Sequence, residues 1–318
     1  MDFILSGLFL QDNIQMLMIP TKCAICETLD NAKVLFNERL PPEGINPHVY
    51  APRRKRDYVH YRFVKCNSCG LVRSDPIIDP HKLSELYQRS ECTYTDKNEN
   101  IPLKKTYGNY IKQLLNEYNV EKETYLDIGC SNGFMLETAL ELGFRNVVGV
   151  EPSKDAINRA NKAIQNKIIN KMFHGELFES EKFNLISFFQ TFDHISDPNG
   201  FLKECYKLLK KDGFIIAIHH NIGSFSYRIL KERSPLIDIG HAYLYDFNTI
   251  KKIFEKNQFT VLKIFSVKNI VSIGRFLELL PIRESIKNIT RQFITDLKIS
   301  GVCVPMYLGN LGIIAQKS

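Results

Sequence analysis

A short loop and two pairs of cysteines are the parts of this 318-residue chain whose residue types and spacing indicate chemistry. The loop reads Asp-Ile-Gly-Cys-Ser-Asn-Gly and runs from Asp127 to Gly133. An apolar run, residues 125–128, leads into it, and apolar residues recur at helical spacing after it. This order predicts a strand, a tight loop and a helix, with the free N–H groups of the helix N-terminus facing a bound ligand.

The spacing of small residues in this loop separates two nucleoside cofactors. A dinucleotide fingerprint needs Gly-x-Gly-x-x-Gly, but counting from Gly129 the chain has Ser131 and then Phe134. The second predicted strand ends at Glu151, whose carboxylate is placed to accept hydrogen bonds from two ribose hydroxyls. We therefore expect a nucleoside cofactor other than NAD, held by Asp127, Gly129, Ser131, Gly133, Glu151 and Gln190.

The cysteine pairs, Cys23-x-x-Cys26 and Cys66-x-x-Cys69, have the spacing of two zinc knuckles. Each knuckle points two thiolates at one ion, and a redox cysteine pair would not need a second copy. Because all four ligands are protein thiolates, the predicted Zn²⁺ has no open position and is structural.

Composition excludes some classes of function. The net charge of +7 comes from 42 basic and 35 acidic residues, so it is a mild bias and nucleic acid is not an expected partner. The densest basic run, residues 53–56, is interpreted as a solvated loop. The sequence lacks both a stretch of about 20 apolar residues and a secretory signal pattern, which favours a soluble, cytoplasmic protein.

The pattern divides the chain into an N-terminal extension (1–19), a zinc-binding module (20–80), a helical linker (81–122) and a larger domain (123–318). In the larger domain strands alternate with helices, which predicts an α/β fold with a parallel sheet. Strands are expected at 124–128, 146–151, 168–173, 183–189, 213–220, 259–267 and 311–316, and helices at 133–143, 153–165, 198–210 and 248–256. A helical insertion at 270–300 precedes the last strand, and its amphipathic pattern leaves a peripheral membrane contact open.

Histidines follow several of these strands, at the sheet edge where α/β proteins bind ligands. An imidazole suits a base that removes a proton from an acceptor near neutral pH. We expect His241 to have this role, supported by His194, with Tyr243 and Tyr245 packing on the acceptor. The strand-end pair at 219–220 is interpreted as structural.

The loop spacing Asp127-x-Gly129-x-Ser131-x-Gly133 resembles motif I of the class I S-adenosylmethionine-dependent methyltransferases, with serine at the usual middle glycine. With the cysteine module, the resemblance extends to a subgroup acting in sugar and cell-surface glycan biosynthesis. The other segments on which this resemblance rests are 61–72, 192–198, 241–247 and 304–310.

The resemblance implies S-adenosylmethionine as cofactor and a seven-strand Rossmann-like sheet whose last two strands are antiparallel. It implies O- or C-methylation of a small molecule or carbohydrate, such as a nucleotide sugar or glycan precursor. The subgroup's C-methyltransferases carry a His-Glu-His-type segment where this chain has a single histidine, His241. Two alternatives are an RNA methyltransferase and a non-catalytic scaffold that keeps the fold.

Overall fold

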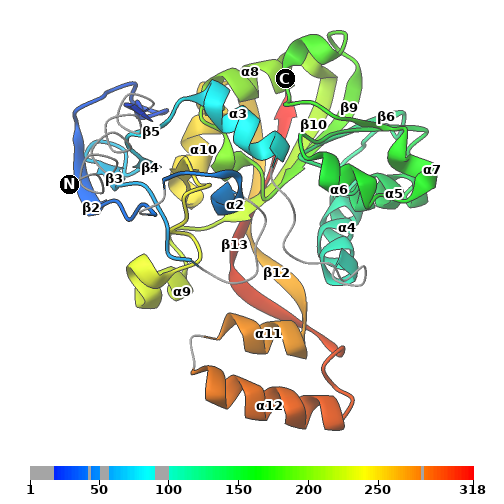
Figure 1. Cartoon of the computed structure of the whole chain (residues 1–318). Coiled ribbons are helices and arrows are strands. Elements are labelled where there is room, and N and C mark those ends of the chain that lie inside the picture. The colour runs from blue at the N-terminus through cyan, green and yellow to red at the C-terminus, as the bar shows by residue number, and fades with distance from the viewer. Residues whose placement is uncertain (1–17, 42–43, 51–56, 90–99, 281–282) are drawn as a thin grey trace.

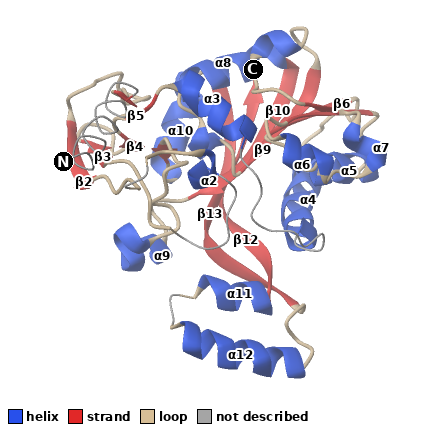
Figure 2. Ribbon diagram, in the orientation of Figure 1, coloured by secondary structure: helices blue, strands red, loops and turns tan. Residues whose placement is uncertain are grey.

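A seven-stranded sheet lies at the centre of the computed structural model, which describes residues 18–318 except 42–43, 51–56, 90–99 and 281–282 (Figures 1 and 2). Its strand order is β12-β13-β10-β9-β6-β7-β8. Strands β6 to β10 run parallel, whereas β13 is antiparallel to both β10 and β12. This is the α/β fold that the sequence predicted. The strands are β6 (Thr124–Ile128), β7 (Asn146–Val150), β8 (Ile168–Ile169), β9 (Phe183–Phe189), β10 (Leu209–His220), β12 (Phe259–Ser272) and β13 (Cys303–Lys317).

Helices cover both faces of the sheet, so its central strands are apolar on both sides. Along β10, Ile215 belongs to one hydrophobic cluster with Phe254, whereas its neighbour Ile216 belongs to a second cluster with Leu136. This alternation follows from the two-residue period of a strand. The covering helices are α4 (Asn100–Glu117), α5 (Phe134–Glu141), α8 (Pro198–Leu208) and α10 (Phe247–Lys256).

The single helix expected at 153–165 is instead two short helices, α6 (Lys154–Asn158) and α7 (Lys162–Gln165). Asn161 interrupts the helix because its backbone is extended and its side chain accepts the N–H of Ala163, which caps a new helix. The other short elements of the core are α9 (Phe225–Leu230) and the 3₁₀ turns η2 (Gly175–Leu177), η3 (Phe192–His194) and η4 (Lys231–Arg233).

The cysteine-containing region forms a four-stranded sheet of order β11-β4-β3-β2. Three strands come from this region, but β11 comes from the larger domain, a pairing that the sequence did not predict. Residues 1–17 and the basic run 53–56 lie outside the described residues. The elements are β1 (Met18–Ile19), β2 (Ala32–Phe36), α2 (Pro47–Tyr50), β3 (Phe63–Cys66), β4 (Val72–Ser74), β5 (Ile77–Ile78), α3 (Pro80–Arg89) and β11 (Tyr243–Leu244).

The last two strands extend well beyond the ends predicted at 267 and 311, and they form a two-stranded arm that leaves the sheet (Figure 1). The arm carries α11 (Ile273–Leu279) and α12 (Glu284–Asp296), so the predicted insertion is helical only between the two strand ends. Apolar side chains of α12 remain exposed, Ile289 by 73% and Phe293 by 63%. Among the described helices, none combines the length and apolar character needed to cross a bilayer.

Candidate active site

The loop between β6 and α5 has the left-handed backbone that its glycines predict. Gly129 and Gly133 have φ angles of 73° and 75°, and a Cβ on Gly129 would collide with the side chain of Thr191. Ser131 also has a positive φ, 51°, at the position where glycine is usual in motif I. The loop therefore turns sharply at the carboxyl end of β6 and leaves its backbone open to a ligand.

Glu151, at the end of β7, is buried against this loop. Its Oε2 accepts the backbone N–H of Ser131 at 2.9 Å, and its Oε1 accepts that of Ser153 at 2.9 Å. Burial raises the pKa of Glu151, and the two backbone hydrogen bonds oppose that rise. The residue predicted to bind ribose hydroxyls is thus also the link between two adjacent β–α loops.

Asp127 lies beneath the loop and is only 3% exposed. Its Oδ1 accepts a hydrogen bond of 2.6 Å from the hydroxyl of Ser187, which is itself 2.6 Å from the hydroxyl of Tyr125. Burial raises the pKa of Asp127 to about 7. A cationic ligand above the loop would favour the ionised form of this carboxyl.

Two buried polar atoms beside the loop have no hydrogen-bond partner among the described residues, Oδ1 of Asn132 and Oε1 of Gln190. Gln190 follows β9 and has a φ of 54°. Its backbone N–H donates a hydrogen bond to the carbonyl of Ile218. A cavity of about 520 Å³ lies beyond the ends of β7 and β8. Its lining consists of Ser84, Gln88, Pro152, Lys154, Asn170, Lys171, Met172 and His174. None of the predicted cofactor residues lines this cavity, so the open backbone and the unpartnered acceptors are the features that fit a nucleoside cofactor.

Three histidines surround the buried carboxylate of Asp193, which follows β9 in η3. Nδ1 of His220, at the end of β10, lies 2.6 Å from Oδ2 of Asp193, and Nε2 of His241 lies 3.8 Å from the same oxygen. The imidazole rings of His194 and His241 are 4.8 Å apart between centroids. We call Asp193, His194, His220 and His241 the histidine cluster.

Although burial opposes ionisation of Asp193, the adjacent histidines outweigh it and hold the pKa of this carboxyl well below its usual value. Burial lowers the pKa of His194, and His241 lowers it further. The cluster therefore contains a buried anion faced by imidazoles, and the side chain of His220 is 25% exposed, whereas His241 is buried.

The structure brings both predicted catalytic histidines into this cluster. His241 is almost fully buried, and its Nδ1–H donates to the carbonyl of Leu236 at 2.8 Å, so Nε2 is the nitrogen that faces Asp193. His194 Nδ1 lies 3.2 Å from the hydroxyl of Tyr87.

Sequence reasoning missed the roles of Asp193 and His220. The available signal was their position at the carboxyl ends of adjacent parallel strands, His220 as the last residue of β10 and Asp193 in the turn after β9. The expectation for the flanking tyrosines was wrong: Tyr243 and Tyr245 are buried, and Tyr245 stacks on Phe192. Tyr243 lies in β11, which pairs with β4, and both tyrosines belong to one buried hydrophobic cluster, so their rings are not presented to an acceptor.

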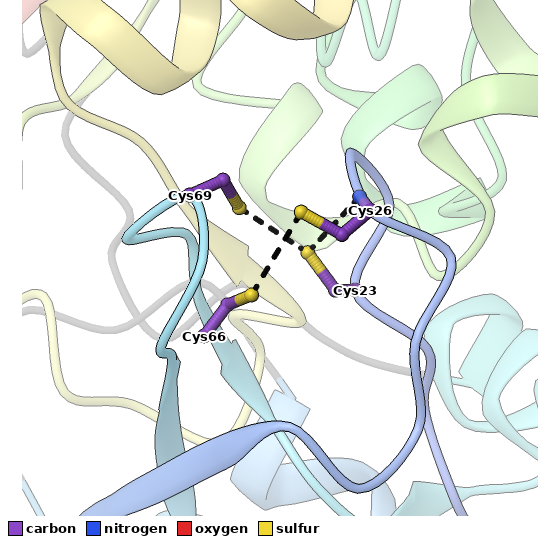
Figure 3. A group of neighbouring side chains, drawn as sticks. All are labelled: Cys23, Cys26, Cys66 and Cys69. Atoms are coloured by element: carbon purple, nitrogen blue, oxygen red, sulfur yellow. Dashed lines mark hydrogen bonds between the residues drawn. The ribbon is translucent and has the colours of Figure 1, made fainter.

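The four predicted zinc ligands converge, although 39 residues separate the two knuckles in the sequence (Figure 3). The Sγ atoms of Cys23 and Cys69 are 3.4 Å apart, those of Cys26 and Cys66 are 4.0 Å apart, and all four lie within 4.8 Å of one another. Tetrahedral zinc with bonds of 2.3 Å places sulfurs about 3.8 Å apart. The donor set and its geometry fit a closed Zn²⁺ site.

The thiols of the knuckles differ in acidity, because burial raises the pKa values of Cys26 and Cys69. Burial opposes ionisation of Cys66, but backbone N–H groups of Cys69 and Ser68 outweigh it and lower the pKa of Cys66 to about 7. The larger domain holds the first knuckle, because Lys256 of α10 donates to the carbonyls of Ala24 and Ile25 at 2.9 and 3.1 Å.

The glycine loop follows β6 and the acid Glu151 follows β7, at the carboxyl ends of parallel strands in an open α/β sheet. This arrangement is typical of folds that bind nucleoside cofactors. The sequence model of a family described as "Methyltransferase domain" matches residues 103–264, about half of the chain. The protein belongs to this family of class I S-adenosylmethionine-dependent methyltransferases.

Two relatives carry the description "Ubiquinone biosynthesis O-methyltransferase". The protein from Pelagibacter ubique is 35% identical over 111 residues, which are 33% of this chain and 46% of the relative. The protein from Coxiella burnetii strain Dugway 5J108-111 is 23% identical over 167 residues, or 50% of this chain and 71% of the relative. The chain thus spans about half the length of the first relative.

Two solved structures are also similar. A SAM-dependent methyltransferase from Archaeoglobus fulgidus has 19% identity and a TM-score of 0.45, with 75% of this chain and 100% of that chain covered. A second, from Aquifex aeolicus, has 14% identity and a TM-score of 0.44, with 76% and 100% covered.

Proposed function

We propose that this methyltransferase transfers the methyl group of S-adenosylmethionine to a hydroxyl oxygen of a small-molecule acceptor held against the histidine cluster. The observation that carries the proposal is the position of that cluster, at the carboxyl ends of β9 and β10. Residues 190–194 follow β9, pass beside the cofactor loop and lead into the cluster. The hydroxyl of Thr191 in this segment donates to the carbonyl of Ile128 at 3.2 Å.

The chain's residues have separate roles in this proposal. Glu151 binds the ribose hydroxyls and Asp127 balances positive charge, while Gln190 and Asn132 offer their unpartnered oxygens to polar groups of the cofactor. The bound cofactor supplies the methyl group on a sulfonium. The acceptor oxygen forms the new bond to carbon as the carbon–sulfur bond breaks, and the electron pair of that bond remains on sulfur.

The acceptor must lose its hydroxyl proton in this reaction, and the histidine cluster is the set of groups that promotes the loss. His241 and His194 stay in the proposal as acceptor-side residues, now joined by His220, whose side chain is 25% exposed and contacts Asp193. O-methylation of a small molecule is supported by the description of the two relatives. A sugar or glycan precursor is a narrower hypothesis that rests on the resemblance of the cysteine module and of the segments 61–72, 192–198, 241–247 and 304–310 to the glycan subgroup.

The test is methyl transfer from radiolabelled S-adenosylmethionine to a panel of acceptors. Catechol-like phenols form one arm of the panel and nucleotide sugars the other. Product analysis then separates O-methyl ethers, which acid cleavage with hydriodic acid demethylates, from C-methyl products, which resist it. Transfer to a hydroxyl oxygen in either arm supports the proposal, and transfer to carbon alone would refute it.

The cysteine module contributes a structural Zn²⁺ in this proposal. Cys23, Cys26, Cys66 and Cys69 hold the ion, which fixes the two knuckles against α10 and thereby the sheet that receives β11. With four thiolates bound, zinc keeps no position open for a substrate.

A further inference from the structure

We infer that the histidine cluster is a second metal site, in which Asp193, His220 and His241 bind one divalent transition-metal ion beside the acceptor. This inference deepens the proposed function, on which its link to the acceptor rests. The site itself is argued from the geometry and chemistry of the three side chains.

The three ligand atoms are close enough to share one ion. Oδ2 of Asp193, Nδ1 of His220 and Nε2 of His241 all lie within 4.8 Å of one another, with Oδ2 at 2.6 and 3.8 Å from the two nitrogens. Metal bonds of about 2.0–2.2 Å to nitrogen and carboxylate oxygen hold neighbouring ligands roughly 3 Å apart. The two distances from Oδ2, 2.6 and 3.8 Å, lie on either side of that value.

The carboxylate of Asp193 can accept more hydrogen bonds or metal bonds than the described residues provide. Asp193 is fully buried, and among the described residues its Oδ1 has no hydrogen-bond partner. An unpaired acceptor on a buried anion is costly, and a cation bound to the same carboxylate offsets that cost. This unpartnered oxygen is evidence for a cation that is independent of the ligand spacing.

The surrounding contacts fix the orientation of one ligand. His241 donates its Nδ1–H to the carbonyl of Leu236 at 2.8 Å, so its Nε2 faces Asp193 without a proton in the neutral ring. A backbone carbonyl bonded to the other ring nitrogen is the usual second contact of a metal-binding histidine. The hydroxyl of Ser74 donates to the backbone carbonyl of His241 at 2.7 Å, which helps to hold the backbone of this ligand in place.

The hydrogen bond between His220 and Asp193 marks the position that the ion would take. Nδ1 of His220 carries a proton in that contact, and a metal ion must displace it to bind the same nitrogen. In a neutral ring that proton would move to Nε2, so the ion would replace the hydrogen bond between His220 and Asp193 with one bond to each residue.

Two imidazoles and one carboxylate favour a first-row transition ion such as Zn²⁺, Fe²⁺ or Mn²⁺ over Ca²⁺ or Mg²⁺. Three protein ligands leave positions open, in contrast to the four-thiolate site. An ion there would present those positions to the acceptor and lower the pKa of a hydroxyl bound to it.

The experiment is an Mn²⁺ titration of the full chain, followed by electron paramagnetic resonance, without cofactor or acceptor. Mn²⁺ prefers nitrogen and oxygen ligands to thiolates, so zinc-loaded cysteine knuckles do not contribute. We expect one Mn²⁺ per chain, displaced by added Zn²⁺, with nitrogen couplings from imidazole in the pulsed spectrum. Asp193→Asn, His220→Gln and His241→Gln should each weaken binding at least about tenfold.

His81→Gln is the matched control, because His81 is an exposed histidine of α3 outside the cluster. S-adenosylmethionine binding by each variant reports that it has folded. The absence of tight Mn²⁺ binding by the wild type, or a spectrum without nitrogen couplings, would refute the metal site and leave an Asp193–His220 proton relay. Mn²⁺ binding by a protein that methylates no hydroxyl would refute the proposed function and retain the site.

Discussion

Oε2 of Glu151 accepts the backbone N–H of Ser131 at 2.9 Å, so the acid that follows β7 holds the loop that follows β6. Ser131 has a left-handed backbone, which costs more for serine than for glycine, and this hydrogen bond helps to keep it there. The residue that we propose as the ribose ligand and the loop that we propose contacts the rest of the cofactor are therefore a single unit.

Replacing Glu151 with alanine should weaken binding of both S-adenosylmethionine and S-adenosylhomocysteine by about 1.5–3 kcal/mol, because a charge-assisted acceptor is lost. That range corresponds to roughly 10- to 100-fold in the dissociation constant, measured by calorimetry. Glu176→Ala, on an exposed residue of η2, is the control. Equal affinities for wild type and the Glu151 variant would exclude Glu151 as a cofactor ligand.

The stability of the protein should depend on pH through Asp127. Its pKa rises from 3.8 to about 7 on folding, so the folded state binds this proton more tightly than the unfolded state. The free energy of unfolding should therefore fall as the pH rises from about 4 to about 7. Asp127→Asn should become more stable relative to wild type by about 2 kcal/mol between pH 5 and pH 7, measured by urea unfolding. A constant difference between the two proteins would contradict the raised pKa.

Freshly prepared, reduced protein should contain one zinc ion in the cysteine knuckles. Cys26→Ser should lose that ion and lower the thermal midpoint, because loss of a thiolate from a closed site costs folding energy directly. Cys303→Ser, on the arm, should keep both the zinc and the midpoint. Elemental analysis of the two variants checks this, and equal zinc contents would rule out the assigned ligands.

His241→Ala should lower turnover about 10²- to 10⁴-fold while the affinity for S-adenosylmethionine stays unchanged, which is the usual effect of removing a group that assists proton transfer. The same substitution at the exposed His81 should leave turnover intact. Single-turnover rates and cofactor titrations measure the two quantities. Full activity of the His241 variant on its acceptor would remove this residue from the mechanism.

Short-range sequence patterns were sufficient to predict most strands of the seven-stranded sheet. Strand β6 was predicted with its observed bounds, 124–128, because an apolar run before a glycine loop is a short-range signal. The convergence of Cys23 and Cys26 with Cys66 and Cys69 was also predictable, because the chemistry of one ion requires it. The proximity of the predicted cofactor residues was predictable for a different reason. The loop and Asp127 on one side and Glu151 on the other lie at the ends of adjacent parallel strands, β6 and β7.

Contacts between distant segments were not predictable. Strand β11 is two residues long and has no periodic pattern of its own, and it forms only because β4 offers a free edge. That pairing determines that Tyr243 faces the core. The contact of His220 with Asp193 likewise depends on the register of β10 beside β9, which a single strand does not encode.

The pairing of β4 with β11 also determines where this enzyme can be cut. A fragment limited to residues 103–264 would lose β13, the partner of β10, as well as the hydroxyl of Ser74 that holds His241. It would expose the edge of β11 to other chains. A fragment that lacks the chain up to and including β4 should therefore be insoluble instead of forming a smaller folded domain.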